Sequence, residues 1–324
     1  MQQRNYLAEA LAQARTRQSW NERLEHWERP ASDSEEAMIE RAARMVRNVM
    51  SRNVWSIGER IQIEPQGSYY NNTNVRRESD IDLRATHPDI LIQYAPNVVP
   101  QAAYYVLGYG SSGKAFVDTA ARLRREVADE LGREFGILNI DASGKKAIKV
   151  KAVPGSRPPV DVVPCFRLHY VFWNTNAQQY GTVQGIAILD RDLNWTSSYP
   201  DQHHARGIDK RARTQLRFKK IVRMLKRLRD ELIQTSALGP KEVPSFLIES
   251  LVHGVEDQYF LVEQDDRYDR LLRIVRRMGA QVHDQACYNA ALEINGINSL
   301  FGADPTRLAS AQKFTNLALQ STYG

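Results

Sequence analysis

The sequence predicts an α+β fold in which a mixed sheet with helices comes first and a mainly helical region follows. Short segments such as "KKAIKVKAV" (145–153) and "PVDVVPCFR" (159–167) alternate or are largely apolar, which is typical of strands. Beyond residue 208, apolar residues recur instead at the spacing of one helix face. This order predicts two domains, residues 1–200 and residues 201–324.

The individual elements follow from the same patterns and from capping and turn residues. In the first domain, helices are expected at 4–28, from a Ser34 cap through Met50, and at 116–135, and strands at 60–66, 79–86, 146–153, 159–167 and 182–189. Residues 190–208, with Trp195 and Pro200, are expected to form a polar loop. In the second domain, helices are expected at 210–235, 244–256, 266–284 and 305–321, with a break at Gly239-Pro240.

The composition is that of a water-soluble globular protein, with 42% apolar and 25% charged residues. No apolar run reaches the roughly 18 residues that a membrane span needs, and no apolar signal segment is present. The two cysteines, Cys165 and Cys287, lie far apart, which argues against a disulfide framework and a cysteine-based zinc site. We therefore expect a cytoplasmic protein without a membrane partner.

Positive charge is concentrated in one segment of the chain. The net charge is +6 and the pI about 9.2, but residues 206–230 alone hold eleven lysines and arginines against two aspartates. The remainder of the chain is therefore net negative. A focused basic segment favours an anionic partner such as a nucleotide, a nucleic acid or phosphate.

Two aspartates stand in an unusual place, within a segment that otherwise reads as a strand. Asp80 and Asp82 are two residues apart, so their side chains project from the same face. A hard divalent cation relieves the repulsion between such carboxylates. Asp161, the one acidic residue of an apolar strand-like run, is the best candidate for a third ligand. The pattern predicts a site for two Mg²⁺ ions, with Mn²⁺ as a possible substitute.

A Gly-Ser pair precedes these aspartates. Gly67 permits a close approach of the backbone, and Ser68 with the following amide groups can cradle a phosphate. Alone, such a pair is common in ordinary turns. Together with the three aspartates, it points to a site for nucleotidyl transfer.

The segment "GSYYNNTNVRRESDIDL" (67–83) resembles the signature of the DNA polymerase β-like nucleotidyltransferase superfamily. Thr73, Arg76 and the ending "SDIDLR" resemble more narrowly the bacterial cGAS/DncV-like nucleotidyltransferases, relatives of cyclic GMP–AMP synthase and oligoadenylate synthase. The resemblance implies a polymerase β-like core and a helical C-terminal lobe with a cleft between them. It also implies that Gly67 and Ser68 cradle phosphate and that Asp80, Asp82 and Asp161 hold the metal ions and carry catalysis.

The resemblance continues along the chain to about residue 255. "WTSSYPDQHH" (195–204) is similar to a Trp/Pro/His loop of that family, and "RFKKIVRMLKRLRDEL" (217–232) to its spine helix. It implies that Lys226 contacts the donor triphosphate. "PSFLIESLV" (244–252) resembles the next helix, which implies that Ser245 binds the triphosphate and Phe246 stacks on the base.

The activity that the resemblance implies is the joining of ATP and GTP into a cyclic oligonucleotide, a second messenger of bacterial anti-phage (CBASS) signalling. A cyclic GMP–AMP-type dinucleotide is the expected product, and a monomer the expected state. The zinc-ligand insertion of the animal enzymes is missing, so a nucleic-acid activator is not implied. Some relatives are conjugated at the C-terminal residue by a ubiquitin-transfer-like partner, and Gly324 suits that chemistry.

Several alternatives stay open from the sequence. The same core can serve another acceptor, giving linear oligoadenylate or modifying RNA or a small molecule. An inactive relative can bind nucleic acid through the basic segment. Gly108–Lys114 has the spacing of a phosphate-binding P-loop, but Ala115 lacks the hydroxyl that binds Mg²⁺. His203 and His204 have no cysteine or acidic residue at zinc-ligand spacing, which favours ordinary residues of the polar loop over a metal site.

Overall fold

The computed structural model describes residues 6–53, 55–56, 60–75, 80–108, 116–302 and 304–323. These residues form two compact units, each described here by itself. The sheet unit comprises the described residues within 31–71 and 76–201, and the helical unit comprises those up to residue 30, residues 72–75 and those from residue 202 on. The expected domains placed residues 1–30 with the sheet, whereas Trp20, Leu24 and Trp27 pack into the core of the helical unit.

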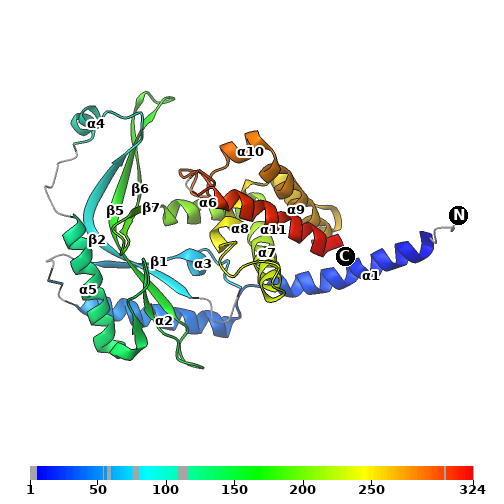
Figure 1. Cartoon of the computed structure of the whole chain (residues 1–324), viewed down its shortest axis with the longest axis horizontal. Helices are drawn as coiled ribbons and strands as arrows, with labels where there is room; N and C mark the ends of the chain where they lie inside the picture. The colour runs from blue at the N-terminus through cyan, green and yellow to red at the C-terminus, as the bar shows by residue number, and fades with distance from the viewer. Residues whose placement is uncertain are drawn as a thin grey trace. The chain divides into compact units, whose positions relative to one another are not determined.

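The sheet unit holds a seven-stranded mixed sheet and its covering helices (Figure 1). The strands are β1 (Gln62–Gln66), β2 (Ile81–Tyr94), β3 (Ile140–Asp141), β4 (Ile148–Val150), β5 (Val160–Asn174), β6 (Gln179–Leu189) and β7 (Trp195–Ser198). The helices are α2 (Asp33–Arg52), α3 (Gly67–Tyr70), α4 (Pro100–Leu107), α5 (Phe116–Phe135) and the short 3-10 turn η1 (Ile137–Asn139). The α+β fold class predicted from the sequence is confirmed.

The strand order is β1-β2-β5-β4-β3, and β6 adds to the far half of β5 with β7 beside it. The pair of β2 and β5 is parallel, and every other pair is antiparallel. Both central strands are longer than predicted. The register of β2 shifts between His87 and Ile90, around Pro88, which has no N–H to donate to a neighbour.

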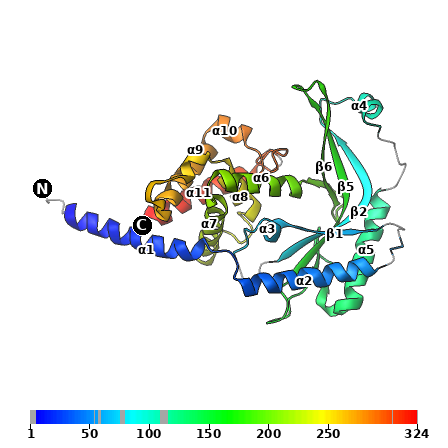
Figure 2. The ribbon, with the colours of Figure 1, turned by 180° about the vertical axis from the view of Figure 1, so that it is seen from behind.

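The two faces of the sheet differ in kind. Ile81, Leu83, Val160 and Val162 point from β2 and β5 into a core closed by α2 and α5, which pack together on this face (Figure 2). Side chains alternate between faces along a strand, so Asp80, Asp82 and Asp161 lie on the opposite face. Burial of the apolar face thus fixes the side from which the carboxylates project.

Helix α2 begins two residues earlier than expected. Ser32, and not Ser34, is its N-cap, and the side chain of Glu35 accepts a hydrogen bond from the backbone N–H of Ser32 at 2.9 Å. This reciprocal capping box satisfies donors that the first turn of a helix leaves unpaired.

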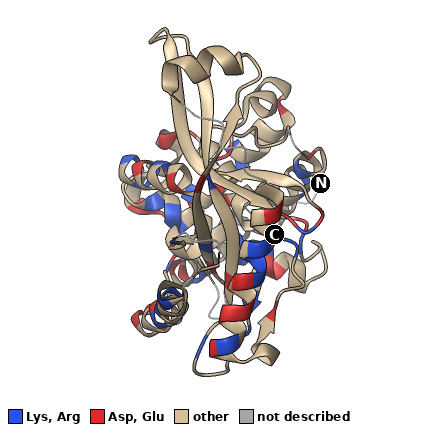
Figure 3. Cartoon of the chain, turned by 90° about the vertical axis from the view of Figure 1, so that its left-hand side faces the viewer, with Lys and Arg blue, Asp and Glu red and all other residues tan. Residues whose placement is uncertain are grey.

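One end of the sheet unit is almost free of charge. Figure 3 shows few Lys, Arg, Asp or Glu residues where α4 meets the far ends of β2, β5 and β6. Here Val99, Tyr105 and Val106 are 60%, 84% and 67% exposed. Helix α4 was not expected from the sequence.

The helical unit is built from α1 (Tyr6–Trp27), α6 (Pro200–Arg213), α7 (Arg217–Gln234), α8 (Ser245–Gly254), α9 (Arg267–His283), α10 (Gln285–Ala290) and α11 (Thr306–Tyr323), with 3-10 turns η2 (Asp257–Phe260) and η3 (Glu263–Asp265). The predicted loop at 190–208 is wrong, because β7 and α6 occupy most of it. The predicted helix at 210–235 is divided, since Gln215 and Leu216 have positive φ values and separate α6 from α7.

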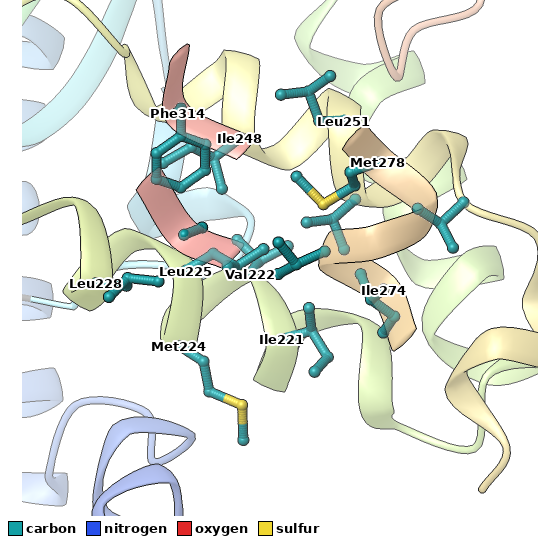
Figure 4. Close-up of a cluster of buried hydrophobic side chains, with 14 of the residues drawn as sticks. Ile221, Val222, Met224, Leu225, Leu228, Ile248, Leu251, Ile274, Met278 and Phe314 are labelled. Carbon is teal, nitrogen blue, oxygen red and sulfur yellow. The ribbon is translucent and has the colours of Figure 1, made fainter. Parts of the chain in front are cut away.

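A single large apolar cluster forms the core of the helical unit (Figure 4). Helix α7 lies at its centre and contributes Ile221, Val222, Leu225 and Leu228, all buried. Side chains from α8, α9 and α11 close around them, including Ile248, Ile274, Met278 and Phe314. None of the described helices is both long enough and apolar enough to cross a membrane.

The half-buried His253 at the end of α8 makes the stability of the helical unit depend on pH. Burial, aided by the cations of α6, lowers the pKa of its imidazole from 6.5 to about 4. Between these values the unfolded chain binds a proton that the folded chain does not, so stability is lost as the pH falls from 6.5 towards 4.

We expect His253→Gln to reduce the loss of unfolding free energy between pH 7 and pH 4.5 by about 2 kcal/mol relative to the parent protein. Urea unfolding at the two pH values measures this difference. Equal pH dependence in both proteins would show that the imidazole titrates alike in the folded and unfolded chains.

Candidate active site

The central feature of the sheet unit is a row of paired residues on neighbouring strands. Asp82 of β2 is paired in register with Asp161 of β5, and Asp161 with Lys149 of β4. Directly paired residues project from the same face, and adjacent strands lie only about 4.8 Å apart. The sheet therefore sets Asp82, Asp161 and Lys149 side by side, although 79 residues separate the two aspartates in the sequence.

Asp80 joins the same group from the residue just before β2. Its carboxylate Oδ2 accepts a hydrogen bond from the ammonium of Lys149 at 2.9 Å. The same nitrogen lies 3.6 Å from Oδ1 of Asp161. Lys149 thus bridges two of the three aspartates that the sequence singled out.

Asp161 is more enclosed than Asp80, with its side chain 20% exposed against 41% for Asp80. Burial raises the pKa of its carboxyl, and the nearby Lys149 ammonium only partly offsets this. Its Oδ1 is buried and has no hydrogen-bond partner in the structure. A buried carboxylate oxygen with unused acceptor capacity is suited to bind a hard cation.

The carboxylates do not converge on one point as they stand. Within the described part of the chain, no three His, Cys, Asp or Glu side chains are grouped closely enough to hold a metal ion. Lys149 occupies the space between Asp80 and Asp161. Carboxylate oxygens are the ligands that Mg²⁺ and Mn²⁺ prefer, so the donor set fits either ion chemically.

Gly67 begins the short helix α3 immediately after β1, and the pairing of Gln66 with Asp82 brings it beside the carboxylates. Its φ is +67°, and a Cβ at this position would lie 2.1 Å from Oδ2 of Asp82. The turn is held from the other side, where the Tyr69 hydroxyl donates to Glu40 of α2. Only glycine fits this conformation and this space.

We expect Gly67→Ala to lower the rate of the reaction carried out at this site about a hundredfold, because a displacement of about 1 Å at reacting groups has that effect. Initial rates of nucleotide turnover measure the loss. Far-UV circular dichroism should show an unchanged fold.

Gly155→Ala is the matched control. Gly155 lies in the same unit with φ +72°, but a Cβ there would have nothing within 4 Å. It shares the backbone strain without the clash, so we expect a small loss of stability and normal turnover. Equal activity losses in both variants would assign the effect to strain alone.

Lys226, expected to contact a triphosphate, is instead buried within the helical unit with only 1% of its side chain exposed. Its ammonium pairs with Glu249 of α8 and donates to the backbone oxygen and the hydroxyl of Thr73 at 3.0 and 3.1 Å. Glu249 also accepts from the Thr73 hydroxyl and lies 2.9 Å from Nε2 of His203, on α6. These contacts all lie within the helical unit, and a contact of Lys226 with the donor triphosphate stays a prediction.

The positive charges of this buried network keep the carboxylate of Glu249 ionised. Burial alone would raise the pKa of Glu249, but Lys226 and His203 outweigh it and hold the pKa well below its usual range. The network fixes residues 72–75, which belong to the helical unit although their neighbours in sequence belong to the sheet unit. Lys226 thus holds this short segment through its two hydrogen bonds to Thr73.

Ser245 and Phe246 open α8, as the sequence predicted. The guanidinium of Arg229, from α7, donates to the Ser245 hydroxyl at 3.0 Å. Phe246 is partly buried at the edge of the apolar cluster, and the guanidinium of Arg307 lies 4.9 Å from the centre of its ring. Arg229, rather than Lys226, is the cation beside Ser245.

Sequence reasoning missed Lys149, Arg229 and Glu249. Glu249 has the signal that identified Asp161, since it is the one acid of the apolar helix "SFLIESLV". Lys149 stands among Lys145, Lys146 and Lys151, and only the register of β4 against β5 distinguishes it. The predictions for Arg76, for Lys114 of the P-loop-like segment and for Gly324 concern residues outside the described part of the chain.

Comparison with known families and relatives shows what this chain is similar to. Residues 205–322 match the model of the cGAS/DncV-like nucleotidyltransferase C-terminal helical domain. The chain is 31% identical over 291 residues to a cyclic dipyrimidine nucleotide synthase, CdnE, of Legionella pneumophila, covering 88% of this chain and 91% of that protein. It is 27% identical to a cyclic dipurine nucleotide synthase of Elizabethkingia meningoseptica, covering 86% and 90%.

Solved structures show the same fold. The structure of E. meningoseptica CdnE, a cyclic dinucleotide synthase, with GTP and Apcpp has a TM-score of 0.73 at 25% identity and covers 93% of this chain and 98% of that chain. The CdnE c-UMP-AMP synthase of Rhodothermus marinus matches with the same TM-score at 21% identity. Together with the 31% identity across nearly the whole Legionella protein, these similarities show that the chain belongs to the cGAS/DncV-like nucleotidyltransferases.

Proposed function

We propose that this nucleotidyltransferase joins two nucleoside triphosphates into a cyclic dinucleotide, with Asp80, Asp82 and Asp161 as its catalytic centre. The observation that carries the proposal is the direct pairing of Asp82 with Asp161 on parallel strands, with Asp80 on the same face. The names of the relatives support the class of product, since those quoted above are cyclic dinucleotide synthases.

Two groups of residues would have different roles in the reaction. Asp80, Asp82 and Asp161 would hold two Mg²⁺ ions, with Mn²⁺ able to replace them. When bound, such ions polarise the phosphate and stabilise the charge on the attacking and leaving oxygens. Gly67 and Ser68 would seat the phosphates on the backbone N–H groups of the first turn of α3.

The bond changes are those of a nucleotidyl transfer. A ribose hydroxyl of the acceptor attacks the α-phosphorus of the donor, its proton passes to the carboxylate of Asp161, and pyrophosphate leaves. A second, intramolecular transfer on the linear intermediate closes the ring and releases a second pyrophosphate. In the helical unit, Ser245 with Arg229 would contact the triphosphate, and Phe246 the base.

The pair of bases is the finer part of the proposal. Relatives at 25–31% identity include dipyrimidine, dipurine, GMP–AMP and UMP–AMP synthases, so overall similarity does not select the bases. We retain a cyclic GMP–AMP-type product as the proposal from the sequence. The role of this product would be second-messenger signalling in bacterial anti-phage (CBASS) defence.

Incubation of the purified protein with Mg²⁺ and labelled nucleoside triphosphates tests the function. ATP with GTP should give a phosphatase-resistant product with the mass of cyclic GMP–AMP, and all six pairs of different bases and four single triphosphates should be compared. A cyclic dinucleotide that contains pyrimidines would contradict the proposed pair of bases and support the proposed reaction. Phosphatase-sensitive oligomers, or no product from any mixture, would overturn the proposal of a cyclic dinucleotide synthase.

A further inference from the structure

Lys149 stands in the position that a cation bound to the carboxylates would take. We propose that Lys149 is a built-in counter-ion of the acidic site: it holds Asp80 and Asp161 in the metal-free protein, leaves them when a divalent cation binds, and thereby sets the affinity for that cation. This inference rests on the proposed metal-dependent function of the three aspartates.

The contacts of Lys149 show that it faces the carboxylates and not merely solvent. Its ammonium lies 2.9 Å from Oδ2 of Asp80 and 3.6 Å from Oδ1 of Asp161. Its other paired neighbour in the sheet, Asp141 of β3, accepts hydrogen bonds from Ser143. Lys149 thus lies between Asp161 and Asp141 in a row of paired residues that also contains Asp82.

Two other lysines of the same segment, Lys145 and Lys151, have different partners. Lys145 pairs with Asp190 and Asp192, and Lys151 donates to the backbone oxygen of Leu138 at 3.0 Å. Lys149 is the one whose strand register against Asp161 directs it to the carboxylates. Its role follows from position in the sheet and not from a general excess of positive charge.

A lysine ammonium and a divalent cation compete for the charge of these carboxylates. The ammonium donates to Asp80 but lies too far from Oδ1 of Asp161 for a hydrogen bond, so it neutralises the carboxylates only in part. Mg²⁺ or Mn²⁺ carries twice the charge and binds carboxylate oxygens directly at shorter distance. The side chain of Lys149 is 39% exposed, so it can move aside without opening the core.

Direct measurement of Mn²⁺ binding, without turnover, tests the proposal. In Lys149→Met the competing charge is lost, and we expect Mn²⁺ to bind about tenfold more tightly in titrations followed by electron paramagnetic resonance. Metal-free Lys149→Met should also melt at a lower temperature and gain more stability from Mn²⁺ than the parent protein. Lys149→Arg, which retains the charge, should bind Mn²⁺ nearly as the parent protein does.

Two further variants make the outcome decisive. Lys151→Met removes a lysine from the same segment and should leave Mn²⁺ affinity unchanged. Asp82→Asn should abolish binding in any background. Unchanged or weaker Mn²⁺ binding by Lys149→Met, with binding still lost in Asp82→Asn, would overturn the role of Lys149 alone. Undiminished Mn²⁺ binding by Asp82→Asn would instead contradict the proposal that the aspartates form a metal site.

Discussion

Asp82→Asn is expected to lower the rate of nucleotide joining about a thousandfold at saturating substrate. The substitution keeps the size of the side chain and removes one carboxylate charge from the paired row. Stabilisation of developing charge by a bound metal ion contributes several kcal/mol to the transition state, and about 4 kcal/mol corresponds to a thousandfold in rate. Steady-state product formation, quantified by chromatography, measures the loss.

Asp129→Asn is a suitable control, because Asp129 is exposed on α5, the helix that covers the opposite face of the sheet. It should retain full activity. Melting temperatures establish that Asp82→Asn is folded; loss of repulsion between neighbouring carboxylates should leave it at least as stable as the parent protein. A folded Asp82→Asn variant with activity within about threefold of the parent protein would contradict a metal-dependent role for this carboxylate.

Lys226→Met is expected to destabilise the helical unit by about 3–5 kcal/mol, because it leaves the carboxylate of Glu249 buried without its main counter-ion. A loss of this size corresponds to a fall in melting temperature of about 10 °C. Differential scanning calorimetry measures it. Had Lys226 been a solvent-exposed triphosphate ligand, the same change would weaken nucleotide binding and leave the melting temperature of the free protein nearly unchanged.

The double variant Lys226→Met/Glu249→Gln separates a buried charge from lost packing. It removes both charges and should recover a large part of the lost stability. Lys220→Met is the matched control on the same helix: Lys220 is 36% exposed, and its partner Glu28 keeps Arg267, so the cost should stay below about 1 kcal/mol. Equal destabilisation by Lys220→Met and Lys226→Met would contradict a special role of the buried pair.

The sequence was sufficient to predict most elements of the fold, because long amphipathic helices and alternating strands leave strong periodic patterns. Helix α5 was predicted with its observed ends, and α8 and α9 within one or two residues. The failures have local causes. Pro200 is the first residue of α6, a position where a helix does not need the N–H that proline lacks. Because proline is also common in loops, the sequence alone did not distinguish the two. The break at Gln215 and Leu216 contains neither glycine nor proline and gives no signal.

The candidate site was predictable where a residue type is unusual for the helix or strand in which it lies. Asp161 stood out as a lone acid in an apolar strand, and the structure places it directly beside Asp82. Whether these residues hold metal and carry catalysis stays a prediction. The burial of Lys226 was not predictable, because it depends on Glu249 and Thr73, which are distant in sequence. Lys149 depends on strand register, which composition and periodicity do not determine.

Manganese located directly in crystals is the most decisive measurement. In crystals soaked in MnCl₂, anomalous scattering should place Mn²⁺ within about 2.2 Å of carboxylate oxygens of Asp80, Asp82 and Asp161, the usual range for such ligands. The ammonium of Lys149 should have moved away from Asp80. Mn²⁺ bound elsewhere, or Lys149 still joining Asp80 to Asp161 beside an occupied metal site, would contradict the proposed catalytic centre or its counter-ion, respectively.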